Sequence, residues 1–292
     1  MLINILDILV PIYATVIFGY LLGRREFPWV SRTIVPLILQ ISLPCLIVSH
    51  FSRQKTVPEG LVEVLISAGI IFTILLGIFY LLLRLFKMPL RTFLGAASLQ
   101  NMSIGLALGF LGFGNTGFAL ALGYASVILF AQFTLGWWIP EGRINVKRTL
   151  SQITIYGIIL GLLLMFVHIQ PPSYIDKTLS LIGQLAIPLL LFSLGFSLAG
   201  IKITRFPKNL VLSAIHLTIC LGIGISTALL MGLENDAFVV VVLLSMLPSS
   251  TINLLMGKES GADMPPMTMF IFCTNIWLVI TLPIGLVLLL PS

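Results

Sequence analysis

Residues 243–256 read LLSMLPSSTINLLM, an apolar stretch with a polar centre. Pro248 lies in that centre. Because a proline lacks the backbone N–H and clashes with the preceding helical turn, a membrane helix must break there. The polar residues that follow can satisfy the freed backbone groups or face a cavity. Residues 98–109 read SLQNMSIGLALG and have the same design. Two interrupted helices at matching places in the two halves of a chain indicate the substrate site of a transporter.

The composition is that of an integral membrane protein. The 292 residues are 58% hydrophobic and 9% charged, whereas a soluble domain carries about 25% charged residues. Apolar stretches of about 20 residues, long enough to span a bilayer as helices, recur along the whole chain. The net charge of +6 comes from short basic clusters between these stretches, so the lipid bilayer is the expected partner and nucleic acid is not.

Ten apolar stretches are expected to cross the membrane as helices. They divide the chain into two halves of five helices, residues 1–141 and 142–292. The predicted fold is therefore an all-α membrane protein with ten transmembrane helices. The spans are residues 3–22, 33–51, 61–83, 93–111, 118–139, 150–167, 179–198, 210–230, 238–256 and 267–290.

Basic residues are distributed unevenly over the connections. The connections after odd-numbered spans hold 13 of the 16 Lys and Arg residues. Since basic connections stay in the cytoplasm, both termini are expected outside it, in a multi-pass protein of the cell (inner) membrane. The regular alternation of basic and non-basic connections also supports the count of ten spans. The 13 residues are Arg24, Arg25, Arg32, Arg84, Lys87, Arg91, Arg143, Lys147, Arg148, Lys202, Arg205, Lys208 and Lys258.

The two halves repeat weakly. Residues 40–47 read QISLPCLI and residues 184–191 read QLAIPLLL. Five helices is an odd number, so the second half enters the membrane from the opposite side and the repeats are inverted, which suits alternating access around a midplane site. The matched pairs are Gln40 with Gln184, Pro44 with Pro188, Leu46 with Leu190, Ser98 with Ser245, Asn101 with Pro248, Ser103 with Ser250, and Gly114 with Gly261.

Uncharged polar residues gather at the two breaks and form the candidate substrate site. Interhelical hydrogen bonding is the structural interpretation. The functional interpretation is a pocket of amide and hydroxyl groups, in which half-helix N-termini favour an anion or exposed oxygens hold Na⁺. Because the polar residues cluster at two related breaks, the functional interpretation is favoured over the structural one. The candidates are Gln100, Asn101, Ser103, Gly105, Pro248, Ser249, Ser250, Thr251, Asn253 and Asn275, with Thr274 weaker.

Ionisable residues are almost absent from the span centres. His216 is the exception, and a neutral imidazole bonded between helices is favoured over a proton-coupling role because no acidic partner is evident. The three cysteines lie in apolar runs without a CxxC pattern, so no metal site is expected. No catalytic motif is recognisable, and an enzyme is not expected. Gly157 and Gly161 have the GxxxG spacing of close helix packing.

The chain resembles the auxin efflux carrier family in its short prokaryotic form. The resemblance rests on residues 11–25 (PIYATVIFGYLLGRR), 42–48 (SLPCLIV), 187–200 (IPLLLFSLGFSLAG), 247–263 (LPSSTINLLMGKESGAD) and 275–289. It implies a scaffold of helices 1, 2, 6 and 7 and a transport domain of helices 3–5 and 8–10. Broken helices 4 and 9 then cross at the substrate site. The family pattern has a proline where this chain has Ala107, so the first break is expected to rest on Gly105 and the polar cluster.

The resemblance implies a secondary transporter of a small organic anion, such as a carboxylate, without a cofactor and with a homodimer through the scaffold. One alternative is a Na⁺-coupled transporter like the bile acid symporters; the proton-linked version would use H⁺. An alternative of another class is a membrane sensor or assembly protein that does not transport.

Overall fold

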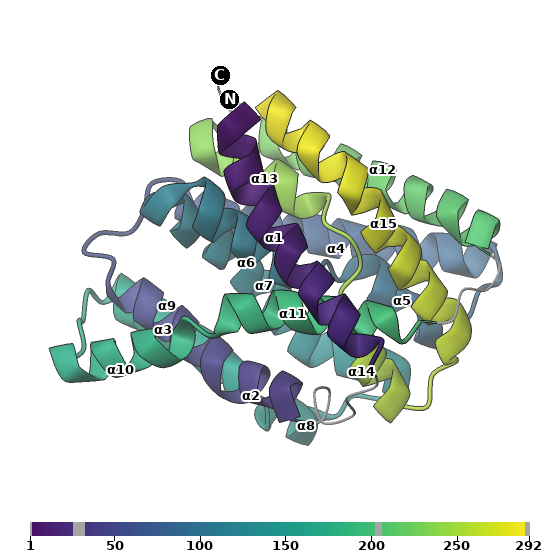
Figure 1. Cartoon of the computed structure of the whole chain (residues 1–292), viewed down its shortest axis with the longest axis horizontal. Coiled ribbons are helices and arrows are strands. Elements are labelled where there is room, and N and C mark those ends of the chain that lie inside the picture. Colours follow the sequence, from purple (N-terminus) through teal and green to yellow (C-terminus); the bar gives the residue numbers. More distant parts are fainter. Residues whose placement is uncertain (1, 26–32, 202–205, 290–292) are drawn as a thin grey trace.

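The computed structural model describes residues 2–25, 33–201 and 206–289. These residues form helices, and the described part of the chain contains no strand (Figure 1). The elements are α1 (Leu2–Gly23), α2 (Val35–Leu37), the π-helical turn η2 (Ile38–Ser42), α3 (Leu43–Ser52), α4 (Leu61–Leu85), α5 (Leu90–Ser98), α6 (Met102–Gly112), α7 (Gly114–Glu141), α8 (Val146–Leu150), α9 (Ile153–Phe166), α10 (Ser173–Gly183), α11 (Ala186–Ala199), α12 (Phe206–Leu230), α13 (Asn235–Ser245), α14 (Ile252–Glu259) and α15 (Met264–Leu289).

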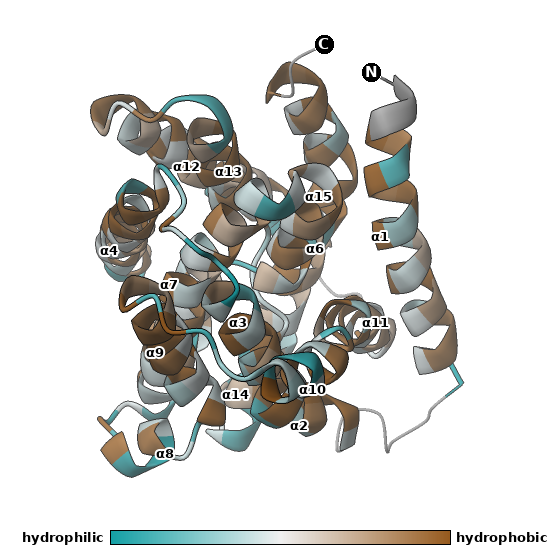
Figure 2. Cartoon of the chain, turned by 90° about the vertical axis from the view of Figure 1, so that its left-hand side faces the viewer, coloured by the Kyte–Doolittle hydropathy of each residue, from teal (hydrophilic) through white to brown (hydrophobic). Residues whose placement is uncertain are grey.

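Seven helical stretches are long and apolar enough to cross a membrane, so the chain is an all-α, multi-pass membrane protein. They are Ile5–Gly23, Val35–Ser52, Leu61–Leu85, Gly114–Glu141, Ser173–Ala199, Phe206–Leu230 and Met264–Leu289. The other three predicted spans fall on shorter apolar helices: α6, α9 and α13. The start of α1 and the end of α15 lie at one end of the molecule, opposite α2, α8 and α14 (Figures 1 and 2).

Both predicted breaks are present. α5 ends at Ser98 before α6 starts, and α13 ends at Ser245 before α14 starts. The first break lies at the polar residues Gln100 and Asn101, as expected, but the expected contribution of Gly105 to it is wrong. Gly105 lies inside α6, where a Cβ atom would meet the side chains of Leu244 and Leu247 on the crossing helix. The glycine permits close packing there, and the break occurs earlier in the chain.

Glycines bring two helix pairs into backbone contact. On α9, Gly157 packs on Pro44 and Gly161 on Ile47, both in α3, which confirms that their GxxxG spacing serves close packing. On α1, Gly19 lies against the backbone of Phe192 in α11. α1 with α11 and α3 with α9 are the most extensive helix pairs in the described chain.

The prolines of the predicted spans two and seven act differently. Pro44 has no N–H for the Gln40 carbonyl, and directly before it the Leu43 N–H bonds the Ile38 carbonyl five residues back, which makes the π-turn. Pro188 lies in the first turn of α11, where its missing N–H costs little. The predicted span 179–198 lies within the apolar stretch Ser173–Ala199, in which α10 ends at Gly183 and α11 begins at Ala186.

Candidate functional site

The two breaks cross and pair through their backbones. Gln100 and Ser249 form an isolated antiparallel bridge. The Asn101 N–H donates to the Pro248 carbonyl at 2.7 Å, and the Ser250 N–H donates to the Leu99 carbonyl at 3.0 Å. Non-helical backbone at membrane depth needs partners inside the protein, and each break supplies them to the other.

Side chains donate to backbone carbonyls next to the breaks. Nε2 of Gln100 donates to the Ser245 carbonyl at 3.4 Å, and the Ala97 carbonyl accepts from Nε2 of His216 at 2.8 Å. The last-turn carbonyls of a helix lack a full set of helical partners, so these two side chains act as C-terminal caps. Nδ2 of Asn253 donates to the Gly95 carbonyl at 3.3 Å, which also accepts from the Leu99 N–H at 3.0 Å. The amide groups at the breaks therefore have a structural role whatever else they bind.

Two helices begin at the crossing. Asn101 caps α6, because its Oδ1 accepts from the Ser103 N–H at 3.1 Å. Oγ of Ser250 accepts from the Ile252 N–H at 3.3 Å in the first turn of α14, and Thr251, which is buried, makes no such side-chain cap. The positive ends of both helix dipoles therefore meet at one place in the core. A helix N-terminus with free N–H groups is a favourable site for an anion.

α15 supports the second break from behind. Oγ1 of Thr274 accepts from the Ser249 N–H at 3.3 Å. Nδ2 of Asn275 donates to the Ser249 carbonyl at 3.4 Å and to the Ile271 carbonyl of its own helix at 2.8 Å. The structure thus brings Asn275 and Thr274 to the crossing, as expected from the sequence.

Gln132 of α7 also belongs to the site, and the sequence reasoning missed it. Its Nε2 donates to Oδ1 of Asn253 at 2.7 Å and approaches the Met256 sulfur at 3.1 Å. The signal was present, because Gln132 is an amide in the middle of the apolar residues 118–139. It was overlooked because it lies in an unbroken helix, away from the two polar clusters.

Several buried polar atoms at the crossing have no hydrogen-bond partner among the described residues. They include amide, carbonyl and hydroxyl groups from both breaks and from α15. Because a buried polar group without a partner is costly, such a concentration indicates a place for a polar ligand or water. The atoms are Oγ of Ser98, Oε1 of Gln100, Nδ2 of Asn101, Oγ of Ser249 and Oδ1 of Asn275.

Two cavities lie beside the crossing. The first has a volume of about 10 Å³, room for one water molecule, and is lined by Gln100, Ser103, Gln132 and Ser250 together with Leu43 of α3 and Leu190 of α11. The second, of about 280 Å³, lies between η2, α7, α8 and α14. One wall of the first cavity is thus formed by α3 and α11, and one wall of the second by η2. Ile252 lines both of them.

His216 lies outside this polar cluster. Its ring stacks on Phe79 at 5.1 Å and meets Phe270 edge-on at 5.3 Å, and it is almost fully buried. It touches the site only through the Ala97 carbonyl. No group of three or more His, Cys, Asp or Glu residues that could hold a metal ion occurs in the described ranges.

Comparison with known families identifies the class of protein. Residues 143–286 match the family model described as membrane transport protein, the family of the auxin efflux carriers. The match is consistent with a transporter of the auxin efflux carrier family. The matched residues include α14 and α15 and hence the second break, Asn253 and Asn275. No curated protein matches the chain. The matched family is one of transporters, so the match indicates a membrane transport protein.

Proposed function

We propose that the chain is a secondary active transporter of a small organic anion, which binds where the two broken helices cross. One observation carries this proposal. The N-termini of α6 and α14 meet beside buried polar atoms that have no partner among the described residues. The substrate class is an anion because helix N-termini carry a positive partial charge. Nδ2 of Asn101 adds a further donor.

The packing of the helices supports a movement between two parts. α1 packs on α11 and α3 packs on α9 and α10, and the η2 turn contacts α3, α9, α10 and α11. α4–α7 and α12–α15 pack together around the crossing. The first group is the proposed scaffold and the second the proposed transport domain. The crossing and both cavities lie where the groups meet, so a displacement of one against the other would change access to the site.

The membrane arrangement follows from the same elements. Seven long helices, the two broken spans and α9 give the proposed ten crossings in two inverted repeats. An even number agrees with the start of α1 and the end of α15 at one end of the molecule (Figure 1). Arg143, Lys147, Arg148 and Lys258 flank α8 and α14 at the opposite end, which we assign to the cytoplasm. Arg32, Lys202 and Arg205 lie outside the described residues.

A Na⁺-coupled transporter is the second candidate. Oε1 of Gln100, Oγ of Ser249 and Oδ1 of Asn275 are uncharged oxygen atoms without partners in the described chain, and such atoms can coordinate Na⁺ at a broken helix. In this version the ion binds first and completes the anion site. His216 would be the coupling residue of a proton-linked version, but its contacts suit a structural role better.

A thermal-shift screen of the purified full-length protein tests the proposal. Dicarboxylates, indole acids and bile acids are each added with and without Na⁺, and a specific ligand raises the melting temperature by mass action. We expect one carboxylate to stabilise the protein and then to be transported into liposomes. A gain that requires Na⁺ would favour the second candidate. Well-folded protein that no anion stabilises would contradict both and favour a sensor or assembly role.

A further inference from the structure

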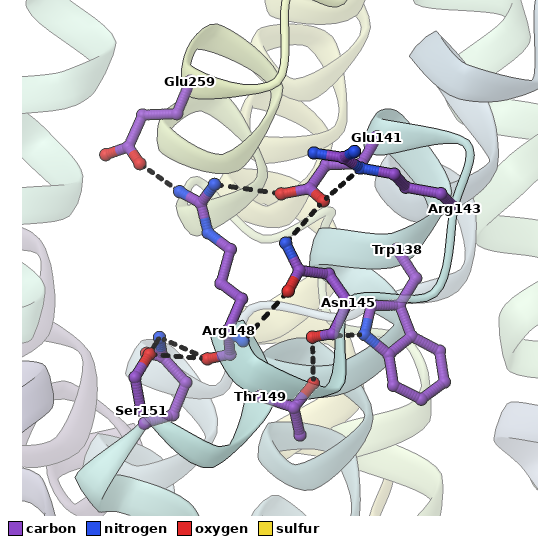
Figure 3. Close-up of polar contacts among 9 residues, drawn as sticks. Trp138, Glu141, Arg143, Asn145, Arg148, Thr149, Ser151 and Glu259 are labelled. Carbon is purple, nitrogen blue, oxygen red and sulfur yellow. Dashed lines mark hydrogen bonds and ion pairs between the residues drawn. The ribbon is translucent and has the colours of Figure 1, made fainter.

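An ion cluster joins three helices at the end of the molecule that carries α8 and α14 (Figure 3). Nη1 of Arg148 on α8 donates to Oε1 of Glu141, at the end of α7, at 2.9 Å. Nη2 of the same guanidinium pairs with Oε2 of Glu259, at the end of α14. The guanidinium lies 3.5 Å from the ring centre of Trp137, which fixes its plane. The two edges of Arg148 therefore hold two different carboxylates.

These two carboxylates differ in accessibility. The Glu141 side chain is 8% exposed and also accepts from Nδ2 of Asn145 at 3.1 Å, so it is a fixed partner of Arg148. The Glu259 side chain is 48% exposed, and Arg148 is its only partner in the cluster that Figure 3 draws. An exposed ion pair contributes little net stability, because water competes for both groups. Glu259 is thus the exchangeable ligand of a guanidinium that Glu141 and Trp137 hold in place.

Arg148 and Glu259 also line the larger cavity. Its volume of about 280 Å³ is close to the lower limit for small-molecule sites, and Gln40, Ser151 and Gln152 supply polar groups to its wall. Ile252 lines both this cavity and the small one at the crossing. The two cavities therefore share a wall residue, and the larger one lies next to the proposed substrate site.

The local charge favours an anion. Arg91 lies close to Gly142 at the end of α7, and Arg143, Lys147, Arg148 and Lys258 belong to the same end of the molecule. Glu141 and Glu259 are the acidic members of the cluster. The charged residues that line the cavity itself are Arg148 and Glu259, so its lining gains a net positive charge when Glu259 leaves Arg148. Positive charge at a cavity raises the local concentration of anionic ligands.

We propose that the larger cavity is an access site for carboxylates, in which a carboxylate of the ligand replaces that of Glu259 on Arg148. The carboxylate of the ligand would accept one or two N–H hydrogen bonds from the Arg148 guanidinium. It would then pass Ile252 to reach the crossing. Glu259 acts as an internal competitor that fills the site when no ligand is bound. The assignment of this ligand as cargo rests on the proposed function, but its binding to Arg148 does not.

Calorimetric titration of the detergent-purified full-length protein with succinate tests the proposal. Glu259→Gln removes the competitor but not the cavity, and we expect the Kd for succinate to fall roughly tenfold. Arg148→Gln should raise the Kd by a similar factor or abolish binding. Arg143→Gln is the matched control, because Arg143 is 78% exposed and lies 3.7 Å from Glu141, so it removes one charge without altering the cavity. Its Kd should stay within about twofold of the wild type.

The outcomes separate this proposal from a purely structural ion pair. If the Arg148–Glu259 ion pair only holds α14 in place, Glu259→Gln should lower the melting temperature and leave the Kd for succinate unchanged or higher. That result would overturn the proposal. Equal affinity of Arg148→Gln and wild type also overturns it, as does no binding of succinate to the Glu259→Gln protein. Each titration is repeated with Asn101→Ser, which should keep the Arg148-dependent binding. Arg148-dependent binding in a wild-type protein that carries no carboxylate into liposomes supports the access site while contradicting the proposed function.

Discussion

The backbone N–H of Asn101 donates a 2.7 Å hydrogen bond to the carbonyl of Pro248, and this bond joins the centres of the two broken helices. Pro248 interrupts its own helix because it has no N–H to give. Asn101 has an N–H but bonds it across the crossing and not to Ala97, whose carbonyl accepts from His216. A break in one helix is thus stabilised by a break in the other. Neither half-helix pair can straighten alone without leaving buried groups unpaired.

The first prediction concerns the side chain of Asn101, which both caps α6 and carries an unpaired amide donor. Asn101→Ser keeps a good N-cap and removes the donor. We therefore expect a melting temperature close to that of the wild type and a loss of anion transport of at least about tenfold, the value of one lost hydrogen bond to a charge. Asn101→Ala should lose about 1 kcal/mol of stability as well.

Liposome uptake and thermal melting of both variants are the measurements. Ser126→Ala is a suitable control, because Ser126 is buried on α7 and bonds only the Leu122 carbonyl of its own helix. Normal transport by Asn101→Ser would show that the amide donor does not contact the substrate.

The second prediction concerns the pair Gln132 and Asn253. Gln132→Met leaves Oδ1 of Asn253 buried without its 2.7 Å partner, and we expect a loss of about 1–3 kcal/mol. Asn253→Leu should cost as much, since it leaves Nε2 of Gln132 without its Oδ1 partner and removes the second donor to the Gly95 carbonyl. The double variant should cost less than the sum of the two. Chemical denaturation of the four proteins gives the coupling energy directly. Simple additivity would mean that the two side chains do not depend on each other.

Much of the fold follows from the sequence because the bilayer imposes strong rules. Apolar length predicts which segments are helices, and Pro248 with its polar followers predicts where a helix breaks. Both breaks are where the sequence places polar residues. Only the role of Gly105 differs from the prediction, which made it part of the first break. In the structure Gly105 serves the close approach of Leu244 and Leu247, and a glycine's two roles look the same in sequence.

The contacts that build the site could be predicted only in part. Clustering within one segment revealed Asn101, Ser250 and Asn253, because neighbours in sequence stay together in a helix. Gln132 and the pairing of Arg148 with Glu259 depend on which helices pack together. A single sequence carries little information on such tertiary contacts. The exact role of each amide, as a cap for the backbone or as a ligand contact, likewise depends on where its partners lie.

The third prediction concerns His216. If the ring only supplies a donor to the Ala97 carbonyl, Gln at this position can replace it, whereas Phe cannot. We expect His216→Gln to keep transport and its dependence on pH, and His216→Phe to lose about 1–3 kcal/mol of stability because a buried carbonyl loses its partner. Transport measured over a range of pH, together with melting curves, distinguishes the roles. A pH dependence that disappears in His216→Gln would show that the ring carries the coupling proton.

The last prediction tests the glycine contact that holds the proposed scaffold together. A Cβ atom on Gly157 would lie 2.8 Å from Cα of Pro44, so Gly157→Ala must push α9 away from α3. Overpacking of this kind typically costs about 1–3 kcal/mol. Gly77→Ala is the matched control, because Gly77 is also inside a helix but has no atom within 4 Å of the added carbon. The control should be neutral or stabilised by up to about 1 kcal/mol, since alanine favours the helix. Equal melting temperatures for the two variants would show that α3 and α9 can separate at little cost, and the rigid scaffold would then have to be sought in the α1–α11 pair.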